Sequence, residues 1–588
     1  MKKIILSLMA CAVLFTGCDL LNTDPYDQFT KSNFFTSETN VEMFANYFYN
    51  EFTGYGQGTG YGQFYFQTLN DNQAVTGLSI WNYTQVPATI STWGNCYTEI
   101  RRANIMIEET PKVDMSQDKI DHWVGVARMY RAWQHYCLVR AFGDCYYVDK
   151  VLSDGDKDVL FGKRQDRDMV MDKVLEDINY AVEHINQDGN SRTAYNVWVA
   201  QAIKSEICLY EGTFCKYRTA LDNGKAADTE RAKKFLGEAK TACEAIIASP
   251  NFELTPGIEG YRANYNSLDL AGNKEMILYK KYVLGLMNHC TIDYCCGSTQ
   301  TNAMSKAAFD SYLFIDGKPL ASTGKEKSDH AVLGTNPQGD VIVNIAAALA
   351  VRDPRLSQHV DSTLRYVGHG EVRYKYEEAG KNAAENTSST GYGVLKFDRD
   401  NGITPTNRQS TTGGETDAPI FWYAEILLNH AEACAELGGN DDAAKASINL
   451  LRDRAGMPSI ETTLACGSDP ANNMGVSDLI WEIRRERRVE MMYDKNDRYW
   501  SLIRWHQLNK LDTKDYPDQT KGAWLGNPEF PAVADLKTPE GASSIDANGY
   551  LDCHNGKPDR IFEAKYYLNP IPSGEATLNP EIGQNPGW

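Results

Sequence analysis

The fold is decided by Tyr423-Ala-Glu-Ile-Leu-Leu-Asn-His-Ala-Glu-Ala-Cys-Ala-Glu-Leu437 and, a few residues on, by Ile448-Asn-Leu-Leu-Arg-Asp-Arg-Ala-Gly-Met-Pro458. Apolar residues recur at spacings of three and four through both runs, which predicts amphipathic helices over 419–437 and 441–455. Gly438-Gly439 and the Gly-Met-Pro that closes the second run predict where the helices stop. Together they predict one helix–turn–helix unit.

The same periodicity recurs on both sides of this unit, and small residues such as Ala200, Ala202 and Ser205 would let paired helices approach closely. The predicted units have roughly the length of tetratricopeptide repeats, although the repeat is degenerate. We therefore expect a mostly α protein with a tetratricopeptide-like scaffold of helix pairs. The further predicted helices cover about 39–52, 90–109, 117–141, 167–185, 195–211, 229–248, 477–492 and 499–508.

Order is lost in the middle of the chain, where Gly, Asn, Thr and Ser become frequent and loops dominate. Alternation in Glu371 to Tyr376 predicts one small strand there. We interpret this segment as an irregular insertion that forms the ligand face. The predicted organisation is a single domain, 18–588, with a helical scaffold at about 39–250 and 419–510, an irregular middle at about 251–418 and a loop-rich tail at 511–588.

The N-terminus has the pattern of a bacterial lipoprotein signal. Lys2 and Lys3 precede an apolar run, Ile4 to Phe15, that is too short to span a bilayer, and Thr16-Gly17-Cys18 follows. We expect residues 1–17 to be removed and Cys18 to carry the lipid that anchors the protein. The alternative is a cytosolic protein that matches the pattern by chance.

Charge and cysteine content exclude several classes of function. The formal net charge is −19, and loss of Lys2 and Lys3 with the signal lowers it to −21, so nucleic acid and highly charged anionic glycans are disfavoured partners. Neutral ligands are compatible with this charge. The 14 cysteines include no repeated C-x-x-C pair and no zinc-type spacing, so no metal or cofactor is predicted. Several lie on apolar helix faces and are expected to be inert core thiols, namely Cys137, Cys208, Cys243 and Cys434.

The last third of the chain contains a series of motifs in a characteristic order. After the first pair of helices come Ile483-Arg-Arg-Glu-Arg-Arg-Val-Glu490, Arg498-Tyr-Trp-Ser-Leu-Ile-Arg-Trp505, Tyr567-Leu-Asn-Pro-Ile-Pro572 and Gln584-Asn-Pro-Gly-Trp588. With Cys18 at the front, this set resembles the RagB/SusD family of surface glycan-binding lipoproteins of Bacteroidetes. The alternating arginines and glutamates of the second motif predict ion pairs along a helix rather than an anion-binding patch. The terminal indole is expected to tuck into the body.

The resemblance implies a function that the residues alone do not show. It implies a helical scaffold under a variable loop face, in a protein held on the outer membrane at the cell surface. Such proteins associate with a SusC-like TonB-dependent barrel and pass captured oligosaccharides to it. Some members of the family resemble peptide receptors, so a peptide ligand is the first alternative.

The sequence shows no catalytic signature of the kind H-E-x-x-H, G-x-S-x-G or Walker A, and we predict that the protein is not an enzyme. A surface glycoside hydrolase remains the competing hypothesis, because it requires only two carboxylates about 5–10 Å apart. New reducing ends released from glycans would identify such an activity.

The first candidate ligand site is Trp81-Asn82-Tyr83, which combines flat apolar rings with planar polar groups. The resemblance supports this choice, because ligand aromatics of the family often lie in this loop. Asp71, just upstream in Asp71-Asn72-Gln73, would add an acceptor. The alternative for Trp81 is a place in the core.

The second candidate is Tyr294-Cys295-Cys296-Gly297. Adjacent cysteines exported to an oxidising compartment can close a rigid vicinal disulfide with an apolar sulfur face, and the alternative is two thiols. Arg365, with five donors, and Tyr392, which we expect to be exposed between Gly391 and Gly393, complete the predicted site.

Overall fold

We describe a computed structural model of the 588-residue chain. The structure describes residues 34–75, 80–186, 191–220, 225–297, 302–323, 331–335, 341–365, 388–399, 412–530, 544–554 and 556–588. The predicted signal, Cys18 and the predicted strand at 371–376 lie outside these residues, and their predictions are not tested.

Helices dominate the described chain, and most bounds in the N-terminal half lie within a residue or two of the prediction. The exceptions are the helix predicted over 39–52, which ends at Asn46, and the one predicted over 195–211, which ends at Tyr217. The longest is α5, Gln117–Phe142, predicted to end one residue earlier. The other longer helices are α3 Glu38–Asn46, α4 Ser91–Glu109, α7 Arg167–His184, α8 Val197–Tyr217, α10 Thr229–Ile247, α11 Gly257–Asn266, α16 Tyr423–Leu437, α17 Asp441–Ala455, α19 Asp478–Glu490 and α20 Asp497–Arg504. The shorter ones are α6 Lys157–Leu160, α12 Lys306–Ser311, α13 Ala346–Ala350, α14 Pro354–His359, α18 Ile460–Leu464 and α21 Ser573–Leu578.

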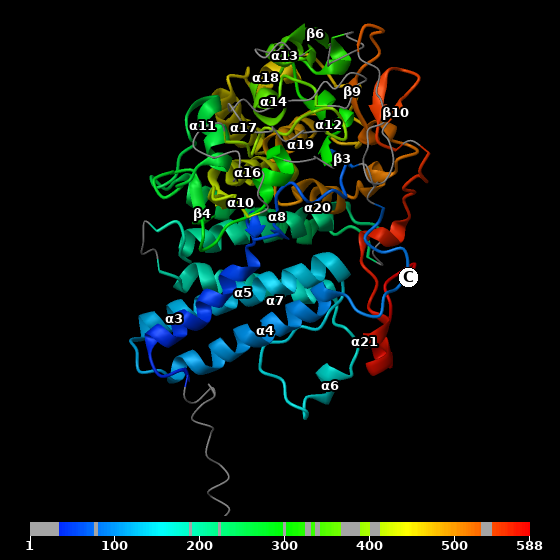
Figure 1. Cartoon of the computed structure of the whole chain (residues 1–588). Helices are drawn as coiled ribbons and strands as arrows, with labels where there is room; N and C mark the ends of the chain where they lie inside the picture. The colour runs from blue at the N-terminus through cyan, green and yellow to red at the C-terminus, as the bar shows by residue number, and fades with distance from the viewer. Residues whose placement is uncertain are drawn as a thin grey trace, which may run out of the picture.

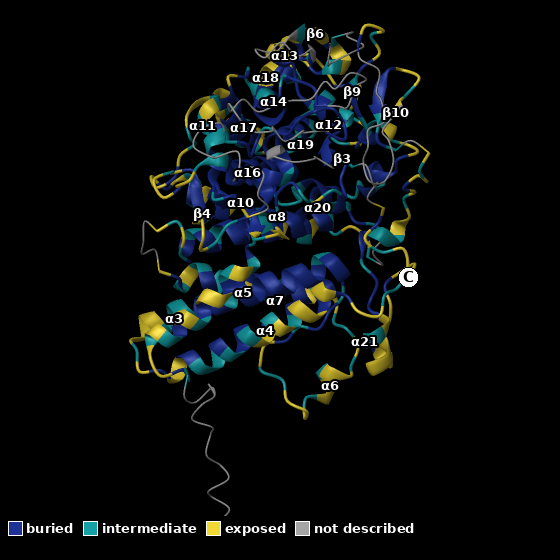
Figure 2. Ribbon diagram, in the orientation of Figure 1, coloured by how far each residue is buried: buried dark blue, intermediate teal, exposed yellow. Residues whose placement is uncertain are grey.

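The long helices pack in succession, α4 on α5, α5 on α7, α7 on α8, α8 on α10, α10 on α16 and α16 on α17 and α19. Figure 1 shows α3, α4, α5 and α7 in the lower half of the view and α16, α17 and α19 above them. In Figure 2 the dark blue of buried residues runs through α5, α8 and α16, whereas α6 and α21 are largely yellow. This succession confirms the mostly α, tetratricopeptide-like fold.

Local sequence sets the ends of these helices. Asn196 begins α8, because its Oδ1 accepts from the backbone N–H groups of Trp198 and Val199 at 3.0 and 3.1 Å. Gly456 ends α17 in the left-handed conformation, at φ 74°, as the Gly-Met-Pro signal predicts.

The helix predicted over 419–437 begins too early, because Ala418–Trp422 is strand β8. It pairs antiparallel with β4, Met276–Lys280, so that Met276 lies opposite Trp422 and Lys280 opposite Ala418. All five residues of β8 are buried. A short, continuous apolar run does not distinguish a buried strand from a helix end. The register of the pair shifts between Leu278 and Tyr279, beside the position of Pro419.

The remaining strands are short and lie mostly in the middle and C-terminal parts of the chain. They pair as hairpins or small sheets that decorate the helical scaffold. Their bounds are β1 Gly56–Gln57, β2 Gly60–Tyr61, β3 Gln73–Val75, β5 Asn302–Met304, β6 Val332–Thr335, β7 Val341–Asn344, β9 Lys521–Trp524, β10 Ser544–Ile545 and β11 Tyr550–Asp552.

The arginines of α19 correct the prediction that their ion pairs run along that helix. Arg485 pairs with Glu482 on its own helix, at 3.1 Å, but Arg484 reaches Glu436 and Arg487 reaches Glu432, both on α16. All of these groups are buried. The reason is that α19 packs into the core against α16, so its charges must be neutralised by neighbouring elements.

The C-terminal residues are fastened to the scaffold, as predicted for the terminal indole. Trp588 is half-buried, and its Nε1 donates to the Leu568 carbonyl at 2.9 Å. Asn585 donates to the carbonyl of Phe142, at the end of α5, at 2.8 Å. Cys137, Cys208, Cys243 and Cys434 are buried, as predicted. Within the described residues, no helix combines the length and the apolar character that crossing a membrane requires.

Candidate functional site

A cavity of about 790 Å³ lies where the loop at 80–83 meets α4, α5, α20 and the segment 63–69. Trp81, Asn82 and Tyr83 all line it, so the structure brings the first predicted site together with helix residues that the sequence did not single out. We call it the first cavity.

Trp81 anchors this loop rather than presenting a free ring. Its side chain is 6% exposed, and the indole stacks on Tyr566 with the ring centroids 4.3 Å apart. The indole Nε1 donates to the Ile561 carbonyl at 2.7 Å. One face and the N–H are therefore occupied by protein, and Trp81 contributes to the cavity wall as a packed residue.

Asn82 and Tyr83 carry the polar character of the loop. Asn82 is exposed and Tyr83 is half-buried. The Asn82 side chain hydrogen-bonds the hydroxyl of Tyr499, whose pKa burial raises above its ordinary value. Burial also raises the pKa of Tyr83. Both tyrosines are therefore neutral hydroxyls at physiological pH, able to donate and accept.

The charged residues of the cavity wall are engaged by the protein. Glu51 accepts from Trp133 Nε1 at 3.2 Å and from Gln134 Nε2 at 2.9 Å. Glu99 likewise accepts from Arg102 Nε and from the Tyr130 hydroxyl, each at 3.1 Å. The other side of the wall is also paired, because Lys495 meets Glu425 at 2.8 Å and the guanidinium of Arg140 lies 4.3 Å from the ring centre of Trp500. The cavity therefore presents a polar surface of nearly balanced charge.

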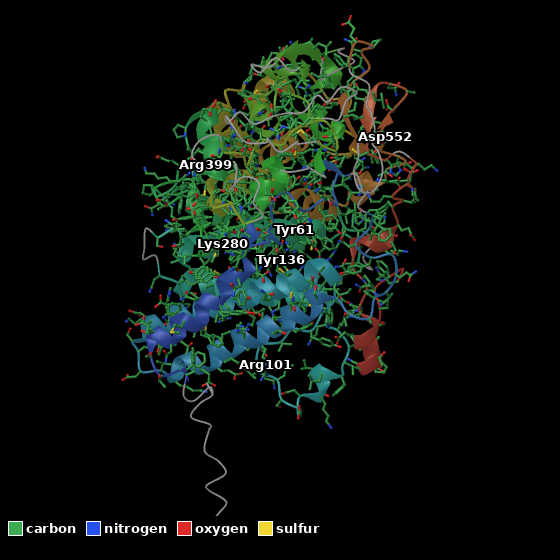
Figure 3. All side chains as sticks on the ribbon, viewed as in Figure 1. Tyr61, Arg101, Tyr136, Lys280, Arg399 and Asp552 are labelled. Atoms are coloured by element: carbon green, nitrogen blue, oxygen red, sulfur yellow. The ribbon has the colours of Figure 1, made fainter. Side chains whose placement is uncertain are left out.

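An aromatic cluster adjoins this cavity, formed by Tyr61, Phe66 and Tyr294. Tyr61 and Phe66 stack with centroids 4.1 Å apart and an angle of 6°, and Tyr294 meets each of them edge-on at 5.6 Å. Tyr61 is 57% exposed, and Phe66 lines the cavity. A hydrogen bond with Tyr61, together with burial, raises the pKa of Tyr294 to about 12. Figure 3 labels Tyr61 at about mid-height in the view.

Glycines hold Tyr61 in this position. Gly56 and Tyr61 pair in the β1–β2 hairpin, and Gly56 has a φ of 92°. A Cβ on Gly56 would lie 2.0 Å from the Gly60 carbonyl oxygen, and one on Gly62 would lie 2.1 Å from that of Gly54. The Gly/Tyr/Gln-rich composition of this segment therefore has a structural cause. Tyr61 and Phe66 were not predicted as site residues, and the signal that could have revealed them is a set of aromatic residues among obligatory glycines.

Of the described side chains in the second predicted site, only that of Tyr294 lies where it could contact a ligand at the surface. Tyr294 belongs to the aromatic cluster, but Cys295 is fully buried. The side chain of Cys296 lies outside the described residues, so the predicted vicinal disulfide is not tested. Since Cys295 is enclosed, Tyr294 is the member of this motif that we retain for a surface site.

The carboxylate of Asp71 is paired with two arginines and is not available to a ligand in the first cavity. It is 7% exposed, and its carboxylate accepts from Arg498 Nε and Nη2, both at 2.7 Å. Arg488 approaches the same carboxylate at 3.3 Å. Burial alone would raise the pKa of Asp71, but Arg488 and Arg498 lower it well below its ordinary value. Asp71 does not line the first cavity and lines a second one.

The expectation that Tyr392 is exposed is wrong, because it is 1% exposed and stacks on Phe309 at 4.6 Å. Its flanking glycines make room for neighbours instead of uncovering the ring. A Cβ on Gly393 would lie 2.5 Å from Arg365 Nε. Arg365 itself is 1% exposed and bonds Asp361 at 2.6 Å. Neither residue lines the first cavity, so we leave both out of the site.

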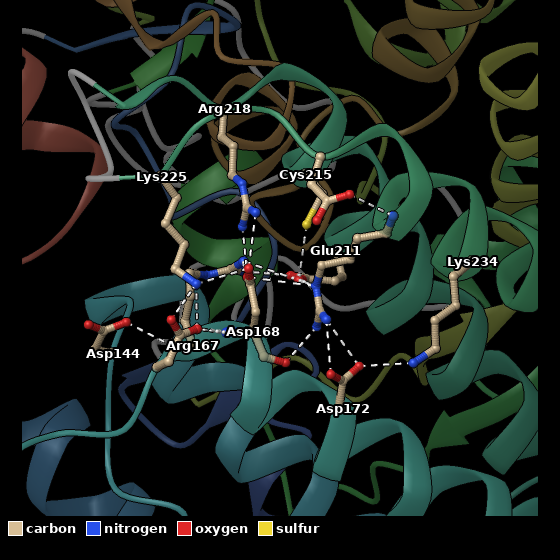
Figure 4. A network of polar contacts seen from close by, with 12 residues as sticks. Asp144, Arg167, Asp168, Asp172, Glu211, Cys215, Arg218, Lys225 and Lys234 are labelled. Carbon is tan, nitrogen blue, oxygen red and sulfur yellow. Dashed lines mark hydrogen bonds and ion pairs between the residues drawn. The ribbon is translucent and has the colours of Figure 1, made fainter.

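A dense polar network lies elsewhere, between α7, α8 and α10 (Figure 4). Asp168, Glu211 and Cys215 come close enough together to suggest a metal site. However, Glu211 accepts from Arg167 at 2.5 Å, and Asp168 accepts from Arg218 at 2.7 Å. The guanidiniums occupy the positions of a cation, and the network joins the three helices.

Known proteins are similar to this chain along most of its length. Residues 277–588, more than half of the chain, match the SusD family, and residues 22–209 match a family described as starch-binding associating with outer membrane. SusD-like protein P2 of Formosa agariphila is 23% identical over 507 residues, which cover 84% of this chain and 80% of that protein.

Two solved structures from Bacteroides fragilis are similar along almost the whole chain. A SusD-like protein is 21% identical with a TM-score of 0.63, over 96% of this chain and 100% of that one. A SusD-like carbohydrate-binding protein is 18% identical with a TM-score of 0.66, over 94% and 100%. These two structures share the fold.

Proposed function

The chain belongs to the SusD family, and we propose on this basis that it binds neutral oligosaccharides in the first cavity and on the aromatic cluster beside it. We further propose that Cys18 anchors it at the cell surface and that it delivers its ligand to a SusC-like TonB-dependent barrel in the outer membrane.

The observation that carries the ligand proposal is the exposed stack of Tyr61 on Phe66 at the edge of a charge-balanced polar cavity. The C–H face of a sugar ring is apolar and packs on a flat aromatic face, whereas its hydroxyls need donors and acceptors. Asn82, Tyr83 and Tyr499 supply these groups from the cavity wall. The net charge of −19 favours a neutral glycan over an anionic one.

Binding without catalysis is supported by the state of the cavity carboxylates. Glu51 and Glu99 each accept two hydrogen bonds from neighbouring side chains. A glycosidase needs one carboxyl group free to protonate a leaving group and a second one positioned as base or nucleophile. Groups engaged in this way are poorly suited to those tasks.

Surface location and partnership are supported by the N-terminal sequence and by the family match. Lys2, Lys3 and the apolar run before Cys18 fit a lipoprotein signal. The family that matches residues 22–209 is described as associating with the outer membrane. A pull-down in mild detergent with a C-terminal tag tests the partnership, and recovery of the monomer alone in several detergents would contradict it.

A ligand array tests the binding proposal. The mature chain with Cys18→Ser, which lacks the proposed lipid, is applied to neutral oligosaccharides, anionic oligosaccharides and peptides. We expect binding to a set of neutral glycans and no new reducing ends after incubation. Binding confined to peptides would replace the proposal with the peptide-receptor alternative, and released reducing ends would indicate a hydrolase.

A further inference from the structure

A second cavity, of about 780 Å³, lies between α12, α19, α20 and the loops around residues 469–474 and 515–519. It shares no lining residue with the first cavity. Exposed Ala321, Ala471 and Pro517 border it, so it opens to solvent. Its wall combines arginines with an apolar face.

Two arginines of this wall share one acidic partner. Arg488 of α19 and Arg498 of α20 both pair with Asp71, at 3.3 and 2.7 Å. The turn between the two helices brings them together, because Tyr493, Lys495 and Asn496 all have positive φ values, of 69°, 50° and 55°.

A third guanidinium, Arg560, adds to the local positive charge. Burial lowers its pKa to about 10, and Asp71 and Asp512 both oppose the shift. Burial likewise lowers the pKa of Arg488 to about 10; Asp71 opposes this shift and Arg498 adds to it. In the wall of the second cavity itself, Arg488 and Arg498 share the single carboxylate of Asp71, which favours the approach of a further anion.

Two of these guanidiniums keep a nitrogen available for a ligand. Across the described part of the chain, no hydrogen bond or ion pair engages Nη1 of Arg488 or Nη1 of Arg498. Neither atom is among the buried polar atoms that lack a partner, so both are accessible, and both arginines line the second cavity. The side chains are otherwise held firmly, with exposed fractions of 12% and 9%.

Three of the four other acidic groups of the wall are engaged by neighbouring side chains, and the fourth, Asp515, is exposed to solvent. Asp310 and Asp518 both bind Lys306, at 2.7 and 2.8 Å. Asp469 binds Arg485 and accepts from the Trp481 Nε1 at 3.2 Å. The half-buried ring of Trp481 and the Met474 side chain supply the apolar part of the wall.

We propose that this second cavity is a binding site for a monocarboxylate whose charged group is attached to a ring with an apolar face. The carboxylate bridges Nη1 of Arg488 and Nη1 of Arg498, and the ring lies against Trp481 and Met474. Charge-assisted bonds from two guanidiniums give the site its preference for carboxylates. A single charge is favoured because the whole chain, at −19, repels polyanions. The site is independent of the glycan function.

Titration calorimetry with acid and amide pairs tests the proposal on the mature chain carrying Cys18→Ser. The probes are phenylacetate against phenylacetamide, for an aryl acid, and D-glucuronate against D-glucuronamide, for a sugar acid. We expect at least one acid to bind, about tenfold or more tighter than its amide. The tighter acid identifies the source of the ligand. Equal binding of acid and amide in both pairs, or no binding of either acid, would overturn the proposal.

Two kinds of variant locate the binding. Arg488→Gln should weaken the acid about tenfold while leaving the amide unchanged. Because that change disturbs a buried ion pair, Ala471→Glu provides a second test at the exposed mouth, with Ala471→Gln as its matched control. The added carboxylate should repel the acid, and the amide side chain of equal size should not. Equal effects of the two Ala471 variants, or unchanged acid binding in all three variants, would contradict the site.

Discussion

Exposure divides the aromatic residues beside the first cavity into two groups with different consequences for mutation. Tyr61 is 57% exposed and stacks on Phe66 through one face, whereas Trp81 is 6% exposed, with its N–H bonded and its ring stacked on Tyr566. The sequence favoured Trp81 because an aromatic residue beside an amide is typical of sugar sites. It could not reveal that the residues from 561 to 566 return to cover the indole.

Replacing Trp81 with alanine should destabilise the protein. Truncation of a buried aromatic side chain leaves a cavity and typically lowers the free energy of unfolding by about 3–5 kcal/mol. Here the Ile561 carbonyl would also lose its donor. Urea unfolding followed by circular dichroism measures the change. A transition midpoint equal to that of the wild type would mean that Trp81 is not part of the packed scaffold.

Tyr61→Ala should weaken ligand binding without destabilising the protein. Loss of the exposed ring should reduce affinity for a neutral oligosaccharide by about ten- to a hundredfold, since aromatic contacts of this kind contribute roughly 1–3 kcal/mol. The melting temperature should change little. Calorimetric titration with an array-selected glycan gives the affinity. Tyr47→Ala, at a tyrosine 43% exposed that does not line the cavity, is the matched control and should bind normally.

At the scale of elements, α16 and α19 are joined by buried charges rather than by apolar contact alone. Glu432 of α16 accepts from Arg487 at 3.0 Å, from Arg504 at 2.8 Å and from Trp505 Nε1 at 2.5 Å. Burial alone would raise the pKa of Glu432, but Arg504 and Arg487 lower it to about 2. The carboxylate is therefore ionised and shared by α19 and α20.

This arrangement predicts a dependence of stability on pH. The folded pKa of Glu432, about 2, lies below its ordinary value of 4.5. Its stabilising contribution is therefore present above pH 4.5 and is lost as the pH falls towards 2. Glu432→Gln should lower the free energy of unfolding by about 3–5 kcal/mol at pH 7, because it leaves Arg487 and Arg504 buried without a carboxylate. The difference between variant and wild type should shrink on acidification below pH 4.5.

Urea midpoints measured from pH 7 to pH 3 for both proteins provide this test. Equal stability at pH 7 would contradict the role of Glu432, as would a difference that stays constant across the range.

The elements also show where sequence periodicity succeeds and fails. The α5 and α17 helices were predicted to within a residue at each end, because long periodic runs closed by glycine leave little ambiguity. The start of α16 was misplaced, since the five apolar residues of β8 are compatible with either structure until β4 supplies a partner. The ion pairs of α19 were expected between residues of that helix, because the helix's own sequence does not reveal what packs against it.

The whole molecule is closed by its C-terminal tail, which connects segments far apart in the sequence. Asn585 donates to the Phe142 and Asn569 carbonyls at 2.8 and 2.7 Å and accepts from Arg164 at 2.8 Å. The sequence predicted a fastened tail but not these partners. At this scale the fold class was predictable, whereas the site was not fully so, because a cavity forms only when several separate segments meet.

Asn585→Ala should therefore weaken the attachment of the C-terminal tail to the rest of the protein. Asn585 is 5% exposed, so its removal takes a buried amide donor from two carbonyls and one acceptor from Arg164, which keeps the Asp144 and Ile582 carbonyls. We expect a loss of about 1–3 kcal/mol in the free energy of unfolding and faster proteolysis of the C-terminal segment. Thermal melts and timed protease digestion measure both. Asn548→Ala, at an exposed asparagine, should change neither, and equal behaviour of the two variants would contradict the role of Asn585.

The central claim is that a neutral oligosaccharide binds at the first cavity against the aromatic cluster. An experimental structure of the protein with an array-selected glycan tests it most directly. We predict a sugar ring in contact with Tyr61 or Phe66, within about 4 Å, and hydroxyls bonded to Asn82, Tyr83 or Tyr499. A glycan bound elsewhere on the protein, with the aromatic cluster uncovered, would contradict the account.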